Sequence, residues 1–169
     1  LDVPEWIGWG AFTQSTKYAF VLLQAWCVTK EERFRTAALL NVDAQLGAHP
    51  LSMSFITGLG SISPKDPLHL PSVYDGAKVP VPGLPVFGPV AHLPHKEPYY
   101  AATQSDRNTF PPARDTLDPF PILRRFIDSH KLVPMTEFTI VNMAVCTAVF
   151  HLLRPTPGSD SGERHPGHE

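Results

Sequence analysis

The sequence has almost no net charge and no long uninterrupted apolar run. Fourteen Lys and Arg residues against sixteen Asp and Glu residues give a formal charge of −2 over 169 residues. This balance provides no basic surface for a nucleic acid or for an anionic membrane. The apolar runs, such as residues 18–27, are shorter than the roughly 20 residues that a membrane-spanning helix needs. We therefore expect neither nucleic acid nor a membrane as a partner.

Cysteine is scarce as well. Cys27 and Cys146 are the two cysteines, and both fall within apolar helical patterns. This favours buried free thiols over a disulfide, and the spacing suits neither a zinc site nor a redox pair. We expect no metal and no cofactor. The sequence also has no recognisable signal peptide and begins at Leu1 without an initiator Met, which predicts a processed or excised piece of a longer chain.

What the sequence does contain is helical periodicity near both ends. Apolar residues recur at helical spacing over residues 15–28, and a capping box from Thr29 to Glu32 predicts a second helix that runs to Leu46. A short connection makes these two an antiparallel pair, as in α/α barrels and many other helical proteins. A last helix is predicted over residues 137–153, and a disordered tail over residues 155–169.

Between the helical parts lies a long segment rich in proline. Thirteen of the nineteen prolines fall within residues 64–121, which excludes a continuous helix or a central strand over most of this range. Residues 79–90 are too apolar for a solvated linker, so we expect them to pack on the domain. Residues 118–126 predict a short helical turn. We treat residues 1–154 as one domain with a long loop region.

The stretch of residues 46–72 has an order of glycines, hydroxyl residues, prolines and a histidine that composition does not explain. Gly47 is expected to end the second helix, and Pro50 prevents the helix from resuming. Residues 55–57 predict a short extended piece, while Gly58 and Gly60 allow a close approach of the backbone. From the glycines and prolines alone, this is an ordinary exit from a helix into a loop.

The order of these residues resembles the C-terminal active-site segment of glycoside hydrolase family 9, the endoglucanase-type (α/α)6 barrels. That family reads Leu-Gly-Arg-Asn-Pro, then Ser-Tyr/Phe-Val-Thr-Gly-Phe/Tyr-Gly, then Asn-Pro-Pro and Pro-His-His-Arg. Among the departures that matter, Ile62 replaces the Asn, Leu68 the first His, and Leu70 the Arg. The matching positions are Leu46, Gly47, Pro50, Ser54, Phe55, Thr57, Gly58, Gly60, Pro64, Pro67 and His69.

A second motif contains two carboxylates, Asp128 and Glu137. From position alone, Glu137 is either a carboxylate that interacts favourably with a helix N-terminus or an acid whose apolar surroundings raise its pKa. The family carries an aromatic-x-Asp pattern followed by a Glu at the same spacing, and there the Glu is the general acid. The resemblance therefore implies that Glu137 is the acid and that Asp128 and His69 lie beside the substrate.

Two aromatic residues are further candidates for binding sugar. Trp9 lies in the segment Trp-Ile-Gly-Trp-Gly, which suits either a platform for stacking on sugar rings or the edge of the core. Tyr99 suits either a carbohydrate groove or a polar surface loop. We include both among the residues expected to bind substrate.

The resemblance implies an all-α fold, the C-terminal portion of an (α/α)6 barrel with long Pro-rich loops. It further implies an inverting glycoside hydrolase that acts on a β-linked glycan, with the catalytic base outside this chain. The remainder of the barrel, as a missing segment or another chain, is the expected partner, and the location is extracellular or periplasmic. The alternative is a non-catalytic carbohydrate-binding or structural relative, because Leu68 and Leu70 replace polar residues. A third possibility is an unrelated small helical interaction domain.

Overall fold

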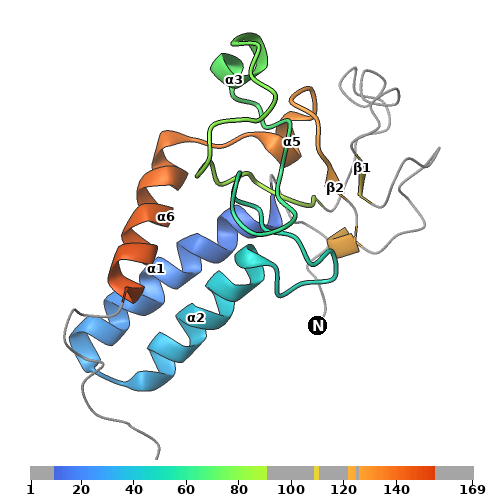
Figure 1. Cartoon of the computed structure of the whole chain (residues 1–169). Helices are drawn as coiled ribbons and strands as arrows, with labels where there is room; N and C mark the ends of the chain where they lie inside the picture. The colour runs from blue at the N-terminus through green and yellow to red at the C-terminus, as the bar shows by residue number, and fades with distance from the viewer. Residues whose placement is uncertain (1–9, 91–108, 111–121, 125, 155–169) are drawn as a thin grey trace, which may run out of the picture.

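The computed structural model describes residues 10–90, 109–110, 122–124 and 126–154 (Figure 1). Trp9, Tyr99 and the expected tail at residues 155–169 lie outside the described residues, as does most of the second half of the Pro-rich segment. The described part consists of three long helices at one end and a layer of loops and short elements at the other (Figure 1).

The helical end is built from α1 (Ala11–Thr29), α2 (Glu32–Leu46) and α6 (Ile140–Leu153). The first two lie side by side with a connection of two residues, and α6 crosses against α1 (Figure 1). The apolar spacing seen in the sequence accounts for this packing, because the residues that recur on one face meet in one core. That core comprises Ala19, Leu23, Ala38, Val42 and Val149.

The predicted capping box at the start of α2 is wrong. Thr29 is still part of α1, and its hydroxyl donates to the Ala25 carbonyl oxygen at 2.9 Å. Lys30 then ends α1 in a left-handed conformation with φ 61°. Glu31 takes the N-cap position of α2 without a side-chain cap. The threonine hydroxyl thus donates within its own helix and also accepts the Glu31 N–H at 3.2 Å, so it joins the two helices but is not the N-cap of α2.

A second core joins the loops that follow α2 to the segment that precedes α6. Residues 53–57 and 83–87 run antiparallel. Val86 donates its N–H to the Phe55 carbonyl oxygen at 2.9 Å, and Thr57 donates its N–H to the Leu84 carbonyl oxygen at 3.0 Å. The expected extended piece and the expected packing of residues 79–90 are both present, although Val79 and Val81 remain exposed. The buried residues of this core are Met53, Phe55, Val86, Val90, Phe126, Ile127, Leu132 and Met135.

Several short elements complete the loop layer. They are α3 (Leu70–Tyr74), β1 (Thr109–Phe110), the 3₁₀ turn η1 (Ile122–Arg124), β2 (Phe126–Ile127) and α5 (Val133–Thr136). The two strands pair antiparallel, with Phe110 opposite Phe126. The sequence predicted a helical turn through Phe126, but the turn ends before this residue, which belongs to β2. Pairing with a strand distant in sequence overrides the local signal.

The last helix also differs from the prediction. It begins at Ile140, and Thr139 is its N-cap, accepting the Asn142 N–H at 3.2 Å. Glu137 instead caps the C-terminus of α5 with extended backbone. Glu137 is therefore three residues before α6, and the predicted start of the last helix at residue 137 is wrong.

The expectation that every apolar run is too short for a membrane needs a correction. In the described part of the chain, Val133–Leu153 has 21 residues and a mean hydropathy of 1.5 in its most apolar window, enough by length and composition to cross a membrane. Core helices of soluble proteins meet the same test. The extended backbone at Glu137 and Thr139 interrupts the segment. The absence of a membrane partner stays a prediction.

The two cysteines occupy different environments. Cys146 is a buried free thiol, as expected, and burial raises its pKa to about 11. Cys27 is free but exposed, so the expectation of burial is wrong for this residue.

Candidate functional site

The residues that follow α2 form a rigid turn around His49. Gly47 ends the helix with φ 131°, as expected from the sequence. The His49 Nδ1 accepts the Leu51 N–H at 3.2 Å, and its Nε2 lies 2.7 Å from the Met53 carbonyl oxygen. Burial lowers the pKa of His49. The sequence analysis did not single out this histidine, which fixes the path of the chain toward Phe55.

Of the two glycines expected to permit a close approach, only Gly58 does so. A Cβ at Gly58 would lie 2.7 Å from the Pro82 Cβ, and its φ is 70°. At Gly60, with φ 76°, the nearest atom to an added Cβ is 3.8 Å away. Gly58 therefore allows residues 81–84 to lie against residues 57–58, whereas Gly60 is required for its backbone conformation.

His69 stands at the start of α3 and is held there by Ser72. Its Nδ1 accepts the Ser72 N–H at 3.3 Å and lies 2.7 Å from the Ser72 hydroxyl oxygen. A nitrogen that accepts an N–H carries no proton, so this arrangement places the proton of a neutral ring on Nε2. Nε2 makes no hydrogen bond within the described residues and is available as a donor.

The loop that carries His69 lies against the segment that carries Glu137. The Leu68 N–H donates to the Thr136 carbonyl oxygen at 3.0 Å. The rings of His69 and Phe138 are 5.7 Å apart between centroids. Two of the predicted site residues, His69 and Glu137, therefore belong to adjoining segments although they are 68 positions apart in the sequence.

The backbone of Glu137 is held on both sides. Its N–H donates to the Val133 carbonyl oxygen at 3.0 Å, and its own carbonyl oxygen accepts the Phe87 N–H at 3.0 Å. The side chain is only partly exposed, and this partial burial raises the pKa of the carboxyl group above its ordinary value. Such a carboxyl group keeps its proton to a higher pH than a fully solvated one.

Asp128, the other carboxylate predicted for the site, is buried. The residue is 1% exposed, and its carboxylate accepts the N–H of Lys65 at 2.7 Å and that of Asp66 at 3.0 Å. Burial raises its pKa to about 6, more than these two hydrogen bonds lower it. The contacts of Asp128 in the structure are with the loop before His69, and contact with a substrate stays a prediction.

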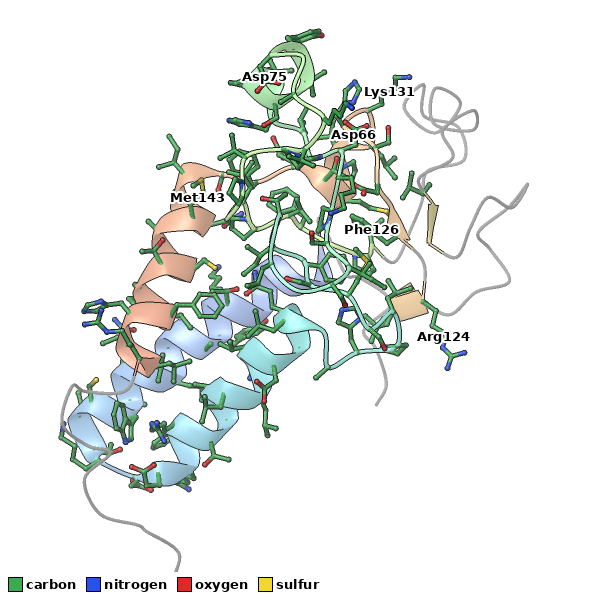
Figure 2. The ribbon with its side chains drawn as sticks, viewed as in Figure 1. Asp66, Asp75, Arg124, Phe126, Lys131 and Met143 are labelled. Atoms are coloured by element: carbon green, nitrogen blue, oxygen red, sulfur yellow. The ribbon has the colours of Figure 1, made fainter. Side chains whose placement is uncertain are left out.

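A hydrogen-bonded pair that sequence reasoning missed, Asp66 and His130, joins the same two segments. Asp66 accepts the His130 N–H at 3.2 Å, and the His130 Nδ1 lies 2.9 Å from each oxygen of the Asp66 carboxylate. Figure 2 shows Asp66 and Lys131 at the end of the molecule that carries α3. No spacing in the sequence signals this pair, because its members are 64 positions apart.

The remaining predicted residues, Trp9 and Tyr99, lie outside the described residues, so binding of sugar by either stays a prediction. Within the described ranges, no group of three or more His, Cys, Asp or Glu residues could hold a metal ion.

Comparison with known proteins gives one family. The sequence profile of glycosyl hydrolase family 9 matches residues 4–150. A xyloglucan-specific endo-β-1,4-glucanase of Bacteroides ovatus, BoGH9A, is 35% identical over 82 residues, which are 48% of this chain and 14% of that protein. A cellodextrinase of Butyrivibrio fibrisolvens is 31% identical over 85 residues, which are 50% of this chain and 16% of that protein. The chain thus spans about a seventh of these relatives.

Solved structures show the same fold. AaCel9A in complex with cellobiose-like isofagomine has a TM-score of 0.65 and 26% identity, covering 85% of this chain and 25% of that one. A thermostable endoglucanase variant of Alicyclobacillus acidocaldarius has a TM-score of 0.66 and 27% identity, covering 86% of this chain and 25% of that one. The described elements are thus part of an all-α (α/α)6 barrel, as the sequence predicted.

Proposed function

The chain belongs to glycosyl hydrolase family 9, and from this premise we propose that the complete protein hydrolyses a β-linked glycan with Glu137 as the general acid. Its relatives include a xyloglucan-specific endo-β-1,4-glucanase and a cellodextrinase. The proposed mechanism is inverting. The acid protonates the leaving oxygen, while a carboxylate outside this chain activates a water molecule on the opposite face of the sugar.

The single observation that supports this assignment is the setting of Glu137. Its backbone is fixed by hydrogen bonds to Val133 and Phe87, its side chain is partly exposed, and its pKa is raised by desolvation. A general acid needs a fixed position, access to the leaving oxygen and a proton retained near the working pH. A carboxylate that served only to stabilise a helix would need neither the access nor the raised pKa, and Thr139 already caps α6.

His69 has a supporting role in this proposal. Its Nδ1 is bonded to Ser72, so the proton of the neutral ring is on Nε2, which is available to donate a hydrogen bond. A sugar hydroxyl accepts such a hydrogen bond. Because the His69 ring packs near Phe138, the residue after Glu137, a bound sugar would contact the histidine beside the acid.

The experiment compares Glu137→Gln with wild type in the complete protein, on an oligosaccharide and on an aryl glycoside with an acidic phenol. Glutamine keeps the size and the hydrogen-bonding capacity but has no proton to transfer. We expect a loss of about 10²–10⁴-fold in kcat/KM for the oligosaccharide. The loss for the aryl glycoside is much smaller, because a phenolate departs without protonation. Equal losses for both substrates would refute the role of Glu137 as acid.

A non-catalytic carbohydrate-binding relative is the second candidate. The observation that favours it is Leu70, which is 56% exposed at the start of α3 beside His69, where the family pattern has a polar residue. Loss of polar contacts to sugar hydroxyls weakens discrimination among glycans. We therefore expect poor turnover of unsubstituted cellulose and better turnover of a substituted or shorter β-glycoside. Binding of oligosaccharides without hydrolysis of any of them would favour this second candidate.

The partner of this chain is proposed to be the remainder of the barrel. Large apolar residues such as Ile140, 85% exposed, and Val141, 70% exposed, lie uncovered at the start of α6. Soluble proteins rarely leave such surfaces open. An extracellular or periplasmic location is part of the proposal and rests on the family alone. Fractionation of cells that express the complete protein tests it, and a purely cytoplasmic protein would refute it.

A further inference from the structure

We propose that Asp66 and His130 form a positioning pair that fixes His69 relative to Glu137. This inference rests on the proposed function, because it assigns the pair a role in binding substrate beside the acid. Neither residue is part of the motifs that identify the family, and neither touches the reacting atoms in this proposal.

The pair belongs to a reciprocal contact between two segments. Asp66 donates its backbone N–H to the Asp128 carboxylate, and its own carboxylate accepts both the backbone N–H and the ring of His130. Each segment thus supplies one carboxylate to backbone N–H groups of the other. Two residues further on, the Leu68 N–H bonds to the Thr136 carbonyl oxygen. The chain reaches His69 directly after this contact.

The consequence is a defined path from the pair to the site. Residues 65–69 are attached to residues 128–138 at Asp128, at His130, at Thr136 and at the Phe138 ring. Of these attachments, Asp128 is buried and Thr136 bonds through its backbone. The His130 side chain reaches the surface, with 29% of it exposed against 30% for Asp66. Its replacement therefore loosens the loop without opening the core.

An ordinary exposed ion pair has little effect, because solvent and side-chain entropy offset the attraction. This pair differs in geometry. The Asp66 carboxylate accepts three close contacts from one residue, and the pair spans 64 positions of the chain. An ionised carboxylate can only accept, so the His130 Nδ1 carries a proton. The charged groups adjoining the pair on the two segments are Lys65, Asp128 and Lys131.

The experiment uses two substitutions of His130 in the complete protein. His130→Asn retains an N–H donor close to the place of Nδ1, and His130→Leu removes it. We expect His130→Leu to lower kcat/KM for a cello-oligosaccharide by roughly 10–100-fold, mainly through KM, because a small misplacement of a binding group has effects of this size. His130→Asn restores most of the activity. The ratio of kcat/KM for the oligosaccharide to kcat/KM for the aryl glycoside stays as in wild type, because Glu137 still supplies the proton.

A double-mutant cycle with His69→Ala separates positioning from general stability. If the pair acts through His69, His130→Leu causes less than about twofold further loss when His69 is already absent. Equal losses in the presence and absence of His69 would overturn the proposal. Asp66→Asn provides a second test of the same cycle should His130→Leu fail to fold, and independence from His69 would again overturn the proposal.

A second readout does not require activity. The His69 ring lies 5.7 Å from the Phe138 ring, so its proton signals in an NMR spectrum of the complete protein carry a ring-current shift. The signals move in His130→Leu and stay in place in His130→Asn if the pair positions His69. Unchanged signals in His130→Leu would overturn the proposal, even if the protein hydrolyses no glycan. A failure of the proposed function would appear separately, in the test of Glu137.

Discussion

The carboxylate of Asp128 accepts a hydrogen bond from the backbone N–H of Lys65, with 2.7 Å between Oδ2 and the nitrogen. The two residues are 63 positions apart, and Asp128 is 1% exposed. An ionised carboxylate in this place loses its hydration, and burial accordingly raises its pKa to about 6. The hydrogen bonds from Lys65 and Asp66 offset this cost only in part.

This burial predicts a dependence of stability on pH. The raised pKa means that Asp128 in the folded protein still holds a proton that it releases in the unfolded chain above the ordinary aspartate pKa of 3.8. The contribution to stability is therefore fully present below about pH 4 and is lost as the pH rises through about 6. Relative to Asp128→Asn, the wild-type free energy of unfolding should fall by up to about 3 kcal/mol between pH 4 and pH 7.

Thermal denaturation of both proteins at several pH values measures this difference. Asp43→Asn, on the exposed face of α2, is the matched control and should keep the wild-type dependence. If the free energy of unfolding changes with pH in the same way for wild type and Asp128→Asn, the prediction is contradicted.

Local signals in the sequence predicted the parts of the fold that local chemistry decides. The end of α2 at Gly47 follows from the conformational freedom of glycine, and the helical pair follows from apolar spacing. The burial of residues 84–90 follows from their composition. In the site, the adjacency of the segments of His69 and Glu137 was expected only because of the family pattern.

What could not be predicted depends on contacts between residues distant in sequence. The partners of Asp66 and Asp128 lie 62 to 64 positions away, so no local pattern indicates them. The start of α6 was misplaced because Thr139 and Glu137 are both acceptable near a helix N-terminus, and the geometry of α5 decides between them. Thr29 was misassigned for the same reason, since a hydroxyl can serve either of two adjoining helices.

A substitution of Gly10, the N-cap of α1, tests whether the start of the first helix supports the site. A Cβ added at Gly10, where φ is 70°, would overlap the Phe87 carbonyl oxygen. Phe87 also donates its N–H to the Glu137 carbonyl oxygen. Gly10→Ala should therefore lower the free energy of unfolding by more than about 2 kcal/mol, from backbone strain and overlap together, and reduce kcat on an oligosaccharide.

The control for this substitution is Gly76→Ala. Gly76 has φ 74°, but no atom lies within 4 Å of an added Cβ, so only the backbone strain remains. Chemical denaturation and steady-state kinetics of the two variants in the complete protein compare them. Equal effects on stability and on kcat would show that contact with Phe87 plays no part.

The exposed start of α6 predicts a stability effect that the described chain alone does not explain. Ile140 is 85% exposed here and occupies the first turn of the helix, where an aspartate is intrinsically favourable. If the rest of the barrel covers this face, Ile140→Asp should lower the free energy of unfolding of the complete protein by about 2 kcal/mol or more. Gln24→Asp, at an exposed polar position of α1, provides a reference for a change in charge. An unchanged or raised melting temperature for Ile140→Asp would mean that this face is open to solvent.

The raised pKa of Glu137 predicts the pH dependence of the reaction. A general acid must be protonated to act, so activity on a poor leaving group declines as the pH rises through the pKa of this residue. Because partial burial raises that pKa, the basic limb of kcat/KM should lie above the range of an ordinary glutamate. For an aryl glycoside with an acidic phenol, protonation is not required, so the same limb should weaken or disappear while the acidic limb, which reports the base, remains. Profiles of kcat/KM for the two substrates measure this, with Asp75→Asn as a control substitution of an exposed carboxylate in the neighbouring loop. Identical basic limbs for both substrates would assign that limb to a group other than Glu137.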